Sequence, residues 1–390
     1  MKRSLVSGLA AVTAAFLITR SAGADAPPLK IGVVTTMSGN FTQSGKTADA
    51  AMAAFFKEHG DTVAGRKVVV IKRDDGGNAP DTAKRLAQEL IVSEHVDFLM
   101  GLVFSPNAKA VGDVSTSAKM PTFITNAASN GILENNPYMA RFSYTEGELT
   151  QPLAQWALKN NIKSVYTIVL DYATGIDAAS GFESVYTAGG GKVLGDVHVP
   201  LNAQDFAPYV QRIKDAHPQA VFAFLSTSAA PFLKAWSAAG GPATGTKILA
   251  TGEFTIESSL PVFGDAGLGV ITAMNYAASH KSPLNTQLTR DMRAADPSVE
   301  EPDFASVATY DVLSAIYKAV ETQKGNLDPD KTMQLVRGMK IDSARGPIMI
   351  DPQTRDIVQN IYIRRVDKVD GKYQNTEIAT YPNVRDPIEK

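Results

Sequence analysis

The strongest constraint on the fold is an alternation of strand-length apolar runs with longer segments of helical periodicity. The first cycle joins the apolar run Lys30–Thr35 to a helical stripe that begins near Ser44 and ends at Gly60. Apolar residues three and four positions apart indicate one face of a helix, whereas short continuous apolar runs indicate buried strands. Strands and helices in alternation usually form a parallel sheet with helices on both faces. The sequence therefore predicts an α/β fold.

The alternation restarts once, after Arg141-Phe142-Ser143, which indicates two α/β units of similar kind. Further strands are expected at 67–72, 97–102, 121–125, 164–170, 192–199, 220–225, 247–251, 269–274, 346–350 and 358–366. Further helices are expected at 81–93, 107–118, 149–160, 206–216, 230–239 and 305–321. Strands after the last helix suggest that the chain returns to the first unit and then to the second.

The first 24 residues have the pattern of a secretory signal. Met1-Lys2-Arg3 is basic, Leu5–Ile18 carries no charge, and Ala22-Gly23-Ala24 offers small residues for cleavage. The apolar run is too short for a bilayer, which needs about 20 residues. A frayed amphipathic helix is the alternative interpretation. We expect cleavage after Ala24, which leaves 366 of the 390 residues, enough for two domains outside the cytoplasm.

Composition excludes several classes of site. The chain has no Cys, which removes disulfides, thiol nucleophiles and zinc sites built on sulfur. Its net charge of −2 becomes about −5 without the basic residues of the leader, which argues against nucleic-acid binding. We expect no metal and no cofactor, because the five His residues lie far apart without ligand spacing. They are His59, His95, His198, His217 and His280.

Catalytic motifs are also missing from the sequence. Gly240–Lys247 resembles a phosphate loop but has Gly-Thr-Lys in place of Gly-Lys-Thr and leads into a strand. No Ser occupies a G-x-S-x-G elbow. Asp74 and Asp75 precede two Gly residues and are interpreted as turn formers. We therefore expect that the protein is not an enzyme. A hydrolase that uses Asp74, Asp75 or Glu253 is the alternative hypothesis.

Polar loops follow several expected strands at their carboxyl ends, where open α/β sheets form their ligand crevice. Some of these loops lead into helices, whose free N–H groups and positive dipole ends favour an anion. A small carboxylate can be held in this way without a cationic side chain. Alternatively, the Ser and Thr residues are only helix caps. The loops are 38–44, 104–106, 126–129, 172–175, 226–228 and 252–254.

These segments, in this order, resemble the type I periplasmic binding proteins of ABC transporters, in the Leu/Ile/Val-binding family. The similar segments are KIGVVTTMSGNFTQSG (30–45), DDGGNAPDTAKRLAQELI (74–91), GLVFS (101–105), PTFITNAAS (121–129), RFS (141–143) and Tyr310-Asp311. The resemblance implies two Rossmann-like lobes joined by three hinge crossovers. Lobe one then comprises 25–144 and about 280–347, and lobe two 145–279 and about 348–390. The crossovers lie near 141–147, 277–282 and 345–352.

The resemblance also implies the residues that bind the ligand. Lobe one supplies Ser105 and the segment from Ala127 to Ser129 for a carboxylate, and the opening loop supplies Phe41 or Ser44. Lobe two supplies Tyr172, Thr174, Ser226 and Glu253, and Tyr276 lies near the second crossover. The full set of ligand-binding candidates is Phe41, Ser44, Ser105, Asn126, Ala127, Ala128, Ser129, Tyr172, Thr174, Ser226, Glu253 and Tyr276.

Two departures from the amino-acid binders resemble the subgroup that binds aromatic acids such as benzoate and hydroxybenzoate. The loop at Tyr172 looks one residue shorter, and Asn126 replaces a common Pro. Against this, Glu253 stands where amino-acid binders place the acid that pairs with the α-ammonium. The resemblance implies a periplasmic monomer that delivers a small carboxylate to an inner-membrane ABC permease. We favour an aromatic acid as this carboxylate. There are two alternatives. The ligand is a branched-chain or other amino acid, or the protein is a ligand sensor on the same fold.

Overall fold

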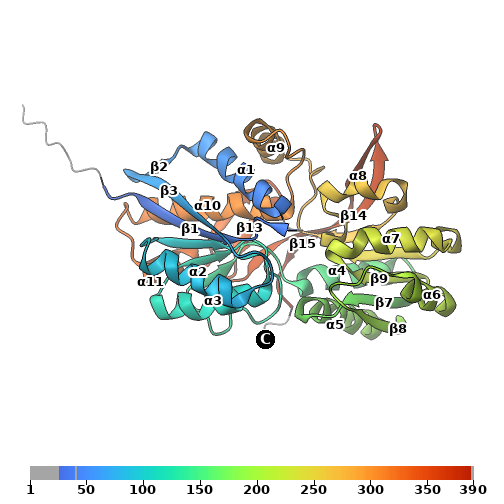
Figure 1. Ribbon diagram of the computed structural model, residues 1–390. Coiled ribbons are helices and arrows are strands. Elements are labelled where there is room, and N and C mark those ends of the chain that lie inside the picture. The colour runs from blue at the N-terminus through green and yellow to red at the C-terminus, as the bar shows by residue number, and fades with distance from the viewer. Residues whose placement is uncertain (1–25, 40–41, 388–390) are drawn as a thin grey trace, which may run out of the picture.

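The computed structural model describes residues 26–39 and 42–387, and it divides into two α/β lobes side by side (Figure 1). The expected leader and Phe41 lie outside the described residues. The sheet of lobe one has six strands in the order β2-β3-β1-β4-β5-β6, and only the β2–β3 pair is antiparallel. Its strands are β1 (Leu29–Thr35), β2 (Thr62–Val63), β3 (Arg66–Asp74), β4 (Phe98–Gly101), β5 (Thr122–Ile124) and β6 (Met139–Arg141).

The second sheet has nine strands, in the order β12-β13-β14-β11-β10-β9-β7-β8 with β15 paired to β14. Its β7 to β11 part is parallel, and the later strands add antiparallel pairs. The strands are β7 (Ser164–Leu170), β8 (Lys192–Val199), β9 (Ala220–Phe224), β10 (Lys247–Thr251), β11 (Ile271–Met274), β12 (Lys340–Ser343), β13 (Gly346–Ile350), β14 (Ile357–Val369) and β15 (Lys372–Val384).

Helices cover both faces of each sheet (Figure 1). In lobe one, α1 (Thr42–His59) and α10 (Phe304–Thr322) pack on one face, and α2 (Pro80–Val92) and α3 (Ser105–Ala118) on the other. Alternate residues of β1 explain the two layers, because Ile31 and Val33 belong to the first core cluster and Val34 to the second.

Lobe two repeats this arrangement. The helices α4 (Glu146–Lys159) and α5 (Ala173–Ala188) pack on one face, and α6 (Ala207–Ala216) and α7 (Ala229–Ala238) on the other. The remaining helices are α8 (Leu260–Phe263), α9 (Pro283–Ala295) and α11 (Pro329–Val336). Within the described ranges, no helix combines the length and apolar character needed to cross a membrane.

The predicted fold class is confirmed, and four expected strands, β7, β8, β10 and β13, agree at both ends. The expected loop 172–175 is wrong in part, since α5 already begins at Ala173. Helix α4 begins at Glu146, three residues before the expected start, because a capping box fixes it there. The Thr145 side chain accepts from the Glu148 N–H, and the Glu148 carboxylate accepts from the Thr145 N–H.

The chain passes between the lobes at three places that meet around one carbonyl. The Ser143 carbonyl oxygen, in the segment after β6, accepts hydrogen bonds from Asn275 Nδ2 at 3.0 Å and from Gln359 Nε2 at 2.9 Å. Arg345 Nη1 lies 3.4 Å from the same oxygen. Along β14, Ile357 packs in the core cluster of lobe one, whereas Ile361 packs with lobe-two residues. The last passage therefore runs through the middle of this strand.

Candidate functional site

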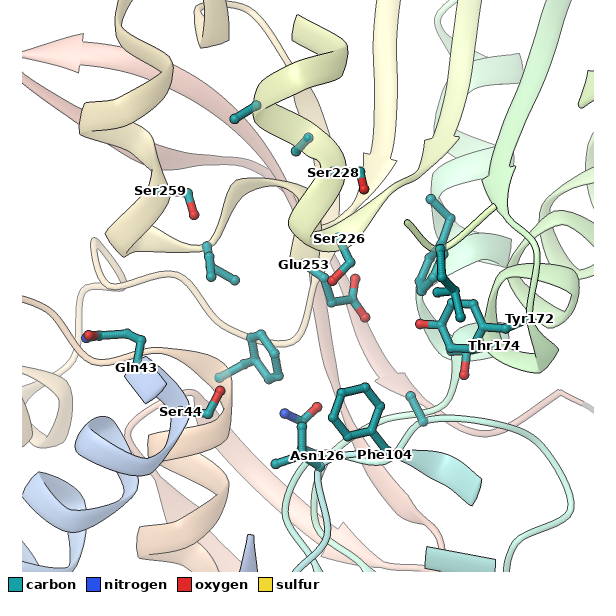
Figure 2. Close-up of a pocket in the computed structure, with 18 of the residues that line it drawn as sticks. Gln43, Ser44, Phe104, Asn126, Tyr172, Thr174, Ser226, Ser228, Glu253 and Ser259 are labelled. Atoms are coloured by element: carbon teal, nitrogen blue, oxygen red, sulfur yellow. The ribbon is translucent and has the colours of Figure 1, made fainter. Parts of the chain in front are cut away.

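A cavity of about 740 Å³ lies between the lobes, at the carboxyl ends of the parallel strands (Figure 2). Its walls come from loops after β4 and β5, from the first turns of α3, α5 and α10, and from lobe-two segments near residues 202, 226 and 253. The residues that line it include Gln43, Ser44, Phe104, Ser105, Asn126, Ala128, Tyr144, Glu146, Tyr172, Thr174, Phe224, Ser226, Ser228, Glu253, Phe263 and Phe304.

The lobe-one wall is positioned by a tight turn at the end of β4. Gly101 has φ +114°, and a Cβ there would lie 2.3 Å from the Val34 carbonyl oxygen, so this position requires glycine. The turn brings the start of α3 to the cavity. No side chain of the described residues caps α3 at Phe104, which leaves first-turn N–H groups without intrahelical partners. Ser105 is the first residue of α3 and not its N-cap, so the alternative interpretation as a helix cap does not hold for this residue.

The lobe-two wall is built in the same way at the end of β7. A Cβ on Gly175 would lie 2.0 Å from the Leu170 carbonyl oxygen, so glycine lets α5 start directly on the strand end. This places Tyr172 and Thr174 at the cavity, as Figure 2 shows. As with α3, no described side chain caps the start of α5. The positive ends of two helices, one from each lobe, thus border the cavity.

Hydroxyl groups connect these two helix starts. The Ser129 N–H donates to Ser105 Oγ at 3.1 Å, and Ser129 Oγ lies 2.9 Å from Thr174 Oγ1. Ser129 belongs to lobe one and Thr174 to lobe two, so this contact joins the lobes directly. The arrangement can hold a small anion through hydroxyl and N–H donors. Of the described residues that line the cavity, none is Lys, Arg or His.

Aromatic rings form much of the remaining surface. The Tyr144 and Phe304 rings meet edge to face at 5.5 Å, and those of Tyr172 and Phe224 lie 6.0 Å apart. Phe104 faces the cavity from lobe one, opposite Tyr172 in Figure 2. Rings bury large apolar areas, and offset or edge contacts suit a further ring between them.

An acidic cluster occupies the lobe-two side of the cavity, where Tyr144 Oη donates a hydrogen bond to Glu253 Oε1. Glu146, the first residue of α4, is fully buried beside Glu253. Burial, with the negative charges of Glu253 and Asp177, raises the pKa of Glu146 well above its ordinary value. Burial and the Glu253 charge likewise raise the pKa of the Tyr144 hydroxyl.

Most of the candidates named from the sequence come together here. Eight line the cavity, namely Ser44, Ser105, Asn126, Ala128, Tyr172, Thr174, Ser226 and Glu253. Ala127 and Ser129 are buried directly behind the wall, where the Ala127 N–H donates to the Leu102 carbonyl. Phe41 is outside the described residues.

Tyr276 does not lie at the cavity. Its ring is fully buried, and its hydroxyl donates to Asn285 Oδ1 at 2.6 Å. The side chain therefore points toward α9. The expected contact of Tyr276 with a ligand is wrong, and the residue has a structural role.

Sequence reasoning missed several cavity residues, chiefly Gln43, Tyr144, Glu146 and Phe304. Tyr144 and Glu146 follow the crossover motif Arg141-Phe142-Ser143. Tyr144 contacts Glu253 across 109 positions of sequence, a contact that only the fold brings about. The apolar stripe of α4 starts at Leu149 and gave no reason to examine the residues before it.

The Asp pair considered for catalysis serves a turn. Asp75 Oδ1 accepts from Thr36 Oγ1 at 2.6 Å and from the Gly77 N–H, and Asp75 Oδ2 accepts from Asn107 Nδ2. Asp74 accepts from the N–H groups of Met37 and Gly76. In the described ranges, no group of three or more His, Cys, Asp or Glu residues could hold a metal ion.

A sequence model described as periplasmic binding protein matches residues 28–372 of this chain. The chain belongs to the periplasmic binding protein family. Among relatives in this family, the Leu/Ile/Val-binding protein homolog 6 of Brucella abortus (strain 2308) is 39% identical over 390 residues, covering 99% of both chains.

Two solved structures of the family are also similar. A solute-binding protein of an ABC transporter from Rhodopseudomonas palustris BisB5, in complex with 3,4-dihydroxybenzoic acid, is 41% identical with a TM-score of 0.88. The match covers 92% of this chain and 99% of that chain. A solute-binding protein from Rhodopseudomonas palustris HaA2, in complex with p-hydroxybenzoic acid, is 41% identical with a TM-score of 0.90, covering 92% and 98%.

Proposed function

We propose that this protein captures a small aromatic carboxylate in the periplasm and delivers it to an inner-membrane ABC permease. The observation that carries the proposal is the cavity between the lobes, which combines rings from both lobes with uncapped helix starts and no described cationic side chain. Apolar walls with a few placed polar groups are typical of sites for small organic ligands. The hydroxybenzoate complexes of the two similar proteins support the same ligand class.

In this proposal the carboxylate binds at the lobe-one side, near Ser105, Asn126 and Ala128, and the ring lies between Phe104 and Tyr172. The helix start at Ser105 supplies N–H and hydroxyl donors for the negative charge. The carboxylate stays away from Glu253, because two like charges in a partly desolvated cavity repel each other strongly.

Ligand delivery depends on hinge closure in this scheme. We assign lobe one to residues 26–39, 42–143 and about 280–357, and lobe two to residues 144–279 and about 358–387, with the third hinge within β14 between Ile357 and Ile361. A ligand that touches both lobes only when they are closed shifts the population toward the closed form. The permease then recognises the closed pair of lobes. A monomer is sufficient for this cycle, and no catalytic step is part of it.

An amino-acid ligand is the second candidate. The name of the Brucella relative and the carboxylate of Glu253 in the cavity favour it, since an α-ammonium group would pair with Glu253. A sensor on the same fold would use the same cavity and differ only in its partner.

A thermal-shift screen of the purified protein, unfolded and refolded to remove carried-over ligand, separates these candidates. The panel holds benzoate, hydroxybenzoates, cinnamates, leucine, valine and phenylalanine. A ligand that binds only the folded state raises the melting temperature. We expect a rise with aromatic acids alone. A rise with amino acids alone would overturn the proposal in favour of the second candidate. Transport assays with a candidate ABC permease would separate delivery from sensing.

A further inference from the structure

Glu146 is a buried carboxyl group with very few counter-charges around it. It is fully buried at the first position of α4 and lines the cavity. The charged and titratable groups that face it are Glu253, Asp177, Arg141, Tyr144 and Tyr172. Arg141 is the one cation among them, and its guanidinium group is already engaged by Asp356 and by the carbonyl oxygens of Tyr144 and Ser129.

The carboxyl groups of Glu146 and Glu253 both line the cavity. No donor of the described residues reaches either oxygen of Glu146 or Oε2 of Glu253. Glu146 is the more buried of the two, and burial disfavours its charged form. The geometry therefore places three buried carboxyl oxygens without a described partner at one part of the cavity wall.

The Glu253 carboxylate is held by one hydrogen bond, from Tyr144 Oη to its Oε1, and its Oε2 has no described donor. A carboxylate has about four lone-pair sites, so it can accept a further hydrogen bond from the cavity. Figure 2 shows Glu253 between Ser226 and Phe104, facing the space between the lobes.

We propose that Glu146, Glu253 and Tyr144 form a subsite for a hydrogen-bond donor on the ligand ring, which selects ring-hydroxylated aromatic acids over unsubstituted or methylated ones. This inference rests on the proposed function, since it places the ligand carboxylate at the Ser105 side and the ring hydroxyl at Glu253. Glu146 adds a second carboxyl group to the subsite, and burial favours its neutral form. The hydroxyl remains neutral, and no proton is transferred to the protein.

Matched ligands test the subsite directly. Hydroxyl and methyl groups have similar size, so 3- and 4-hydroxybenzoate are compared by calorimetry with 3- and 4-methylbenzoate on the refolded protein. We expect at least one hydroxylated acid to bind about tenfold or more tightly than its methyl counterpart, as a hydrogen bond to a charged group predicts. Glu253→Gln should reduce this preference to about threefold or less, because the acceptor loses its charge.

Glu146→Gln tests the proton on Glu146. The amide has the size of the neutral acid and carries no charge, so the preference should persist, and the exposed Glu321→Gln serves as a control for the removal of a carboxyl group. The thermal unfolding of each variant reports its folding independently of ligand. The subsite would be overturned by any of three results: equal affinity for hydroxylated and methylated acids, full preference in Glu253→Gln, or loss of preference in Glu146→Gln. The proposed function would stand in each case. If no aromatic acid binds, the proposed function itself fails.

Discussion

At the scale of single residues, the cavity places neutral donors where other anion sites place Lys or Arg. Ser105 is the clearest of these, because it stands at the uncapped start of α3 and its Oγ already accepts from the Ser129 N–H. A hydroxyl can accept that bond and still donate to a carboxylate. Ser105 therefore connects the backbone of the loop 126–129 to the proposed ligand.

We expect Ser105→Ala to weaken binding of the aromatic acid by about 1 kcal/mol or more, roughly fivefold or greater, since one hydrogen bond to a charged group is lost. Calorimetric titration measures the change. The matched control is Ser117→Ala at the exposed end of the same helix, where the hydroxyl donates only to the Asp113 carbonyl. Equal affinities in both variants would show that the carboxylate binds elsewhere.

The raised pKa of Glu146 predicts how stability depends on pH. In the unfolded chain this carboxyl group loses its proton near pH 4.5, whereas in the folded protein burial raises its pKa well above that value. Between these two pKa values the folded state binds the extra proton, so Glu146 lowers the free energy of unfolding as pH rises, by up to about 1.4 kcal/mol per pH unit.

Glu146→Gln removes this dependence, because the amide does not titrate. We expect the variant to gain stability relative to the natural protein as pH rises from about 4.5 to 8, with no such gain below the unfolded pKa. Urea unfolding across this range measures the difference, and Glu321→Gln on the exposed end of α10 is the control for the removal of a carboxyl group. A difference that stays constant with pH would mean that Glu146 is ionised in the folded protein.

Single residues also mark where prediction from sequence ends. Ser105, Tyr172 and Glu253 were found because each follows the carboxyl end of an expected strand, where parallel sheets bind ligands. Glu146 follows no such strand and starts a helix, and its partner Glu253 is brought close only by the packing of two lobes. Tyr276 shows the opposite error, since nearness to a crossover does not determine which way a side chain points.

At the scale of elements, helix α10 connects the stability of lobe one to the shape of the cavity. Its N-cap residue Asp303 accepts from the Ser306 N–H at 2.7 Å and from Thr47 Oγ1 of α1 at 3.1 Å. The next residue, Phe304, lines the cavity. The cap therefore fixes both the start of the helix and the position of a ring beside the ligand.

We expect Asp303→Ala to lower the free energy of unfolding by about 1 kcal/mol, the usual loss of an N-cap, and also to weaken ligand binding through Phe304. The control is Asp328→Ala, which removes the cap of α11, where Asp328 accepts from the Lys331 N–H at 2.8 Å far from the cavity. It should lose similar stability and keep full affinity. If both variants bind equally well, the start of α10 does not position the ring.

Elements differ in how clearly the sequence defines them. Strands such as β7 and β10 agree with the prediction at both ends, because each is a short, mostly apolar run that ends at a turn residue. The start of α5 was misjudged because Thr174 and Gly175 are typical of loops. Here Gly175 is required by the close approach of the helix to the carbonyl of Leu170, five residues earlier, in the turn that joins β7 to α5.

At the scale of the whole molecule, the three passages between the lobes meet in one buried layer, which we propose as the hinge. They converge on the Ser143 carbonyl through Asn275 and Gln359, while Arg345 pairs with Asp311 at 2.8 Å in the same buried layer. None of these residues lines the cavity, so in this proposal their contacts persist while the lobes move apart at the cavity. The Ser129–Thr174 contact, in comparison, connects the lobes at the cavity wall and must break on wide opening.

Ligand binding should therefore shorten distances across the front of the cavity and leave distances within a lobe unchanged. The natural sequence has no Cys, so spin labels can be attached only at introduced sites. We choose Lys46→Cys on α1 and Lys234→Cys on α7, both exposed and each close in sequence to cavity-lining residues of a different lobe. Lys46→Cys with Lys318→Cys on α10 keeps both labels in lobe one and serves as the control pair.

We expect the α1–α7 distance distribution, measured by double electron–electron resonance, to shift to shorter values on addition of the aromatic acid that binds, because the ligand stabilises the closed form. The α1–α10 distribution should not change. In Ser105→Ala, the same shift should require a higher ligand concentration, since only differential affinity for the closed form drives closure. A ligand that binds without shortening the α1–α7 distance would show that capture does not involve hinge closure, and recognition by the permease would then have to depend on the ligand-bound surface alone.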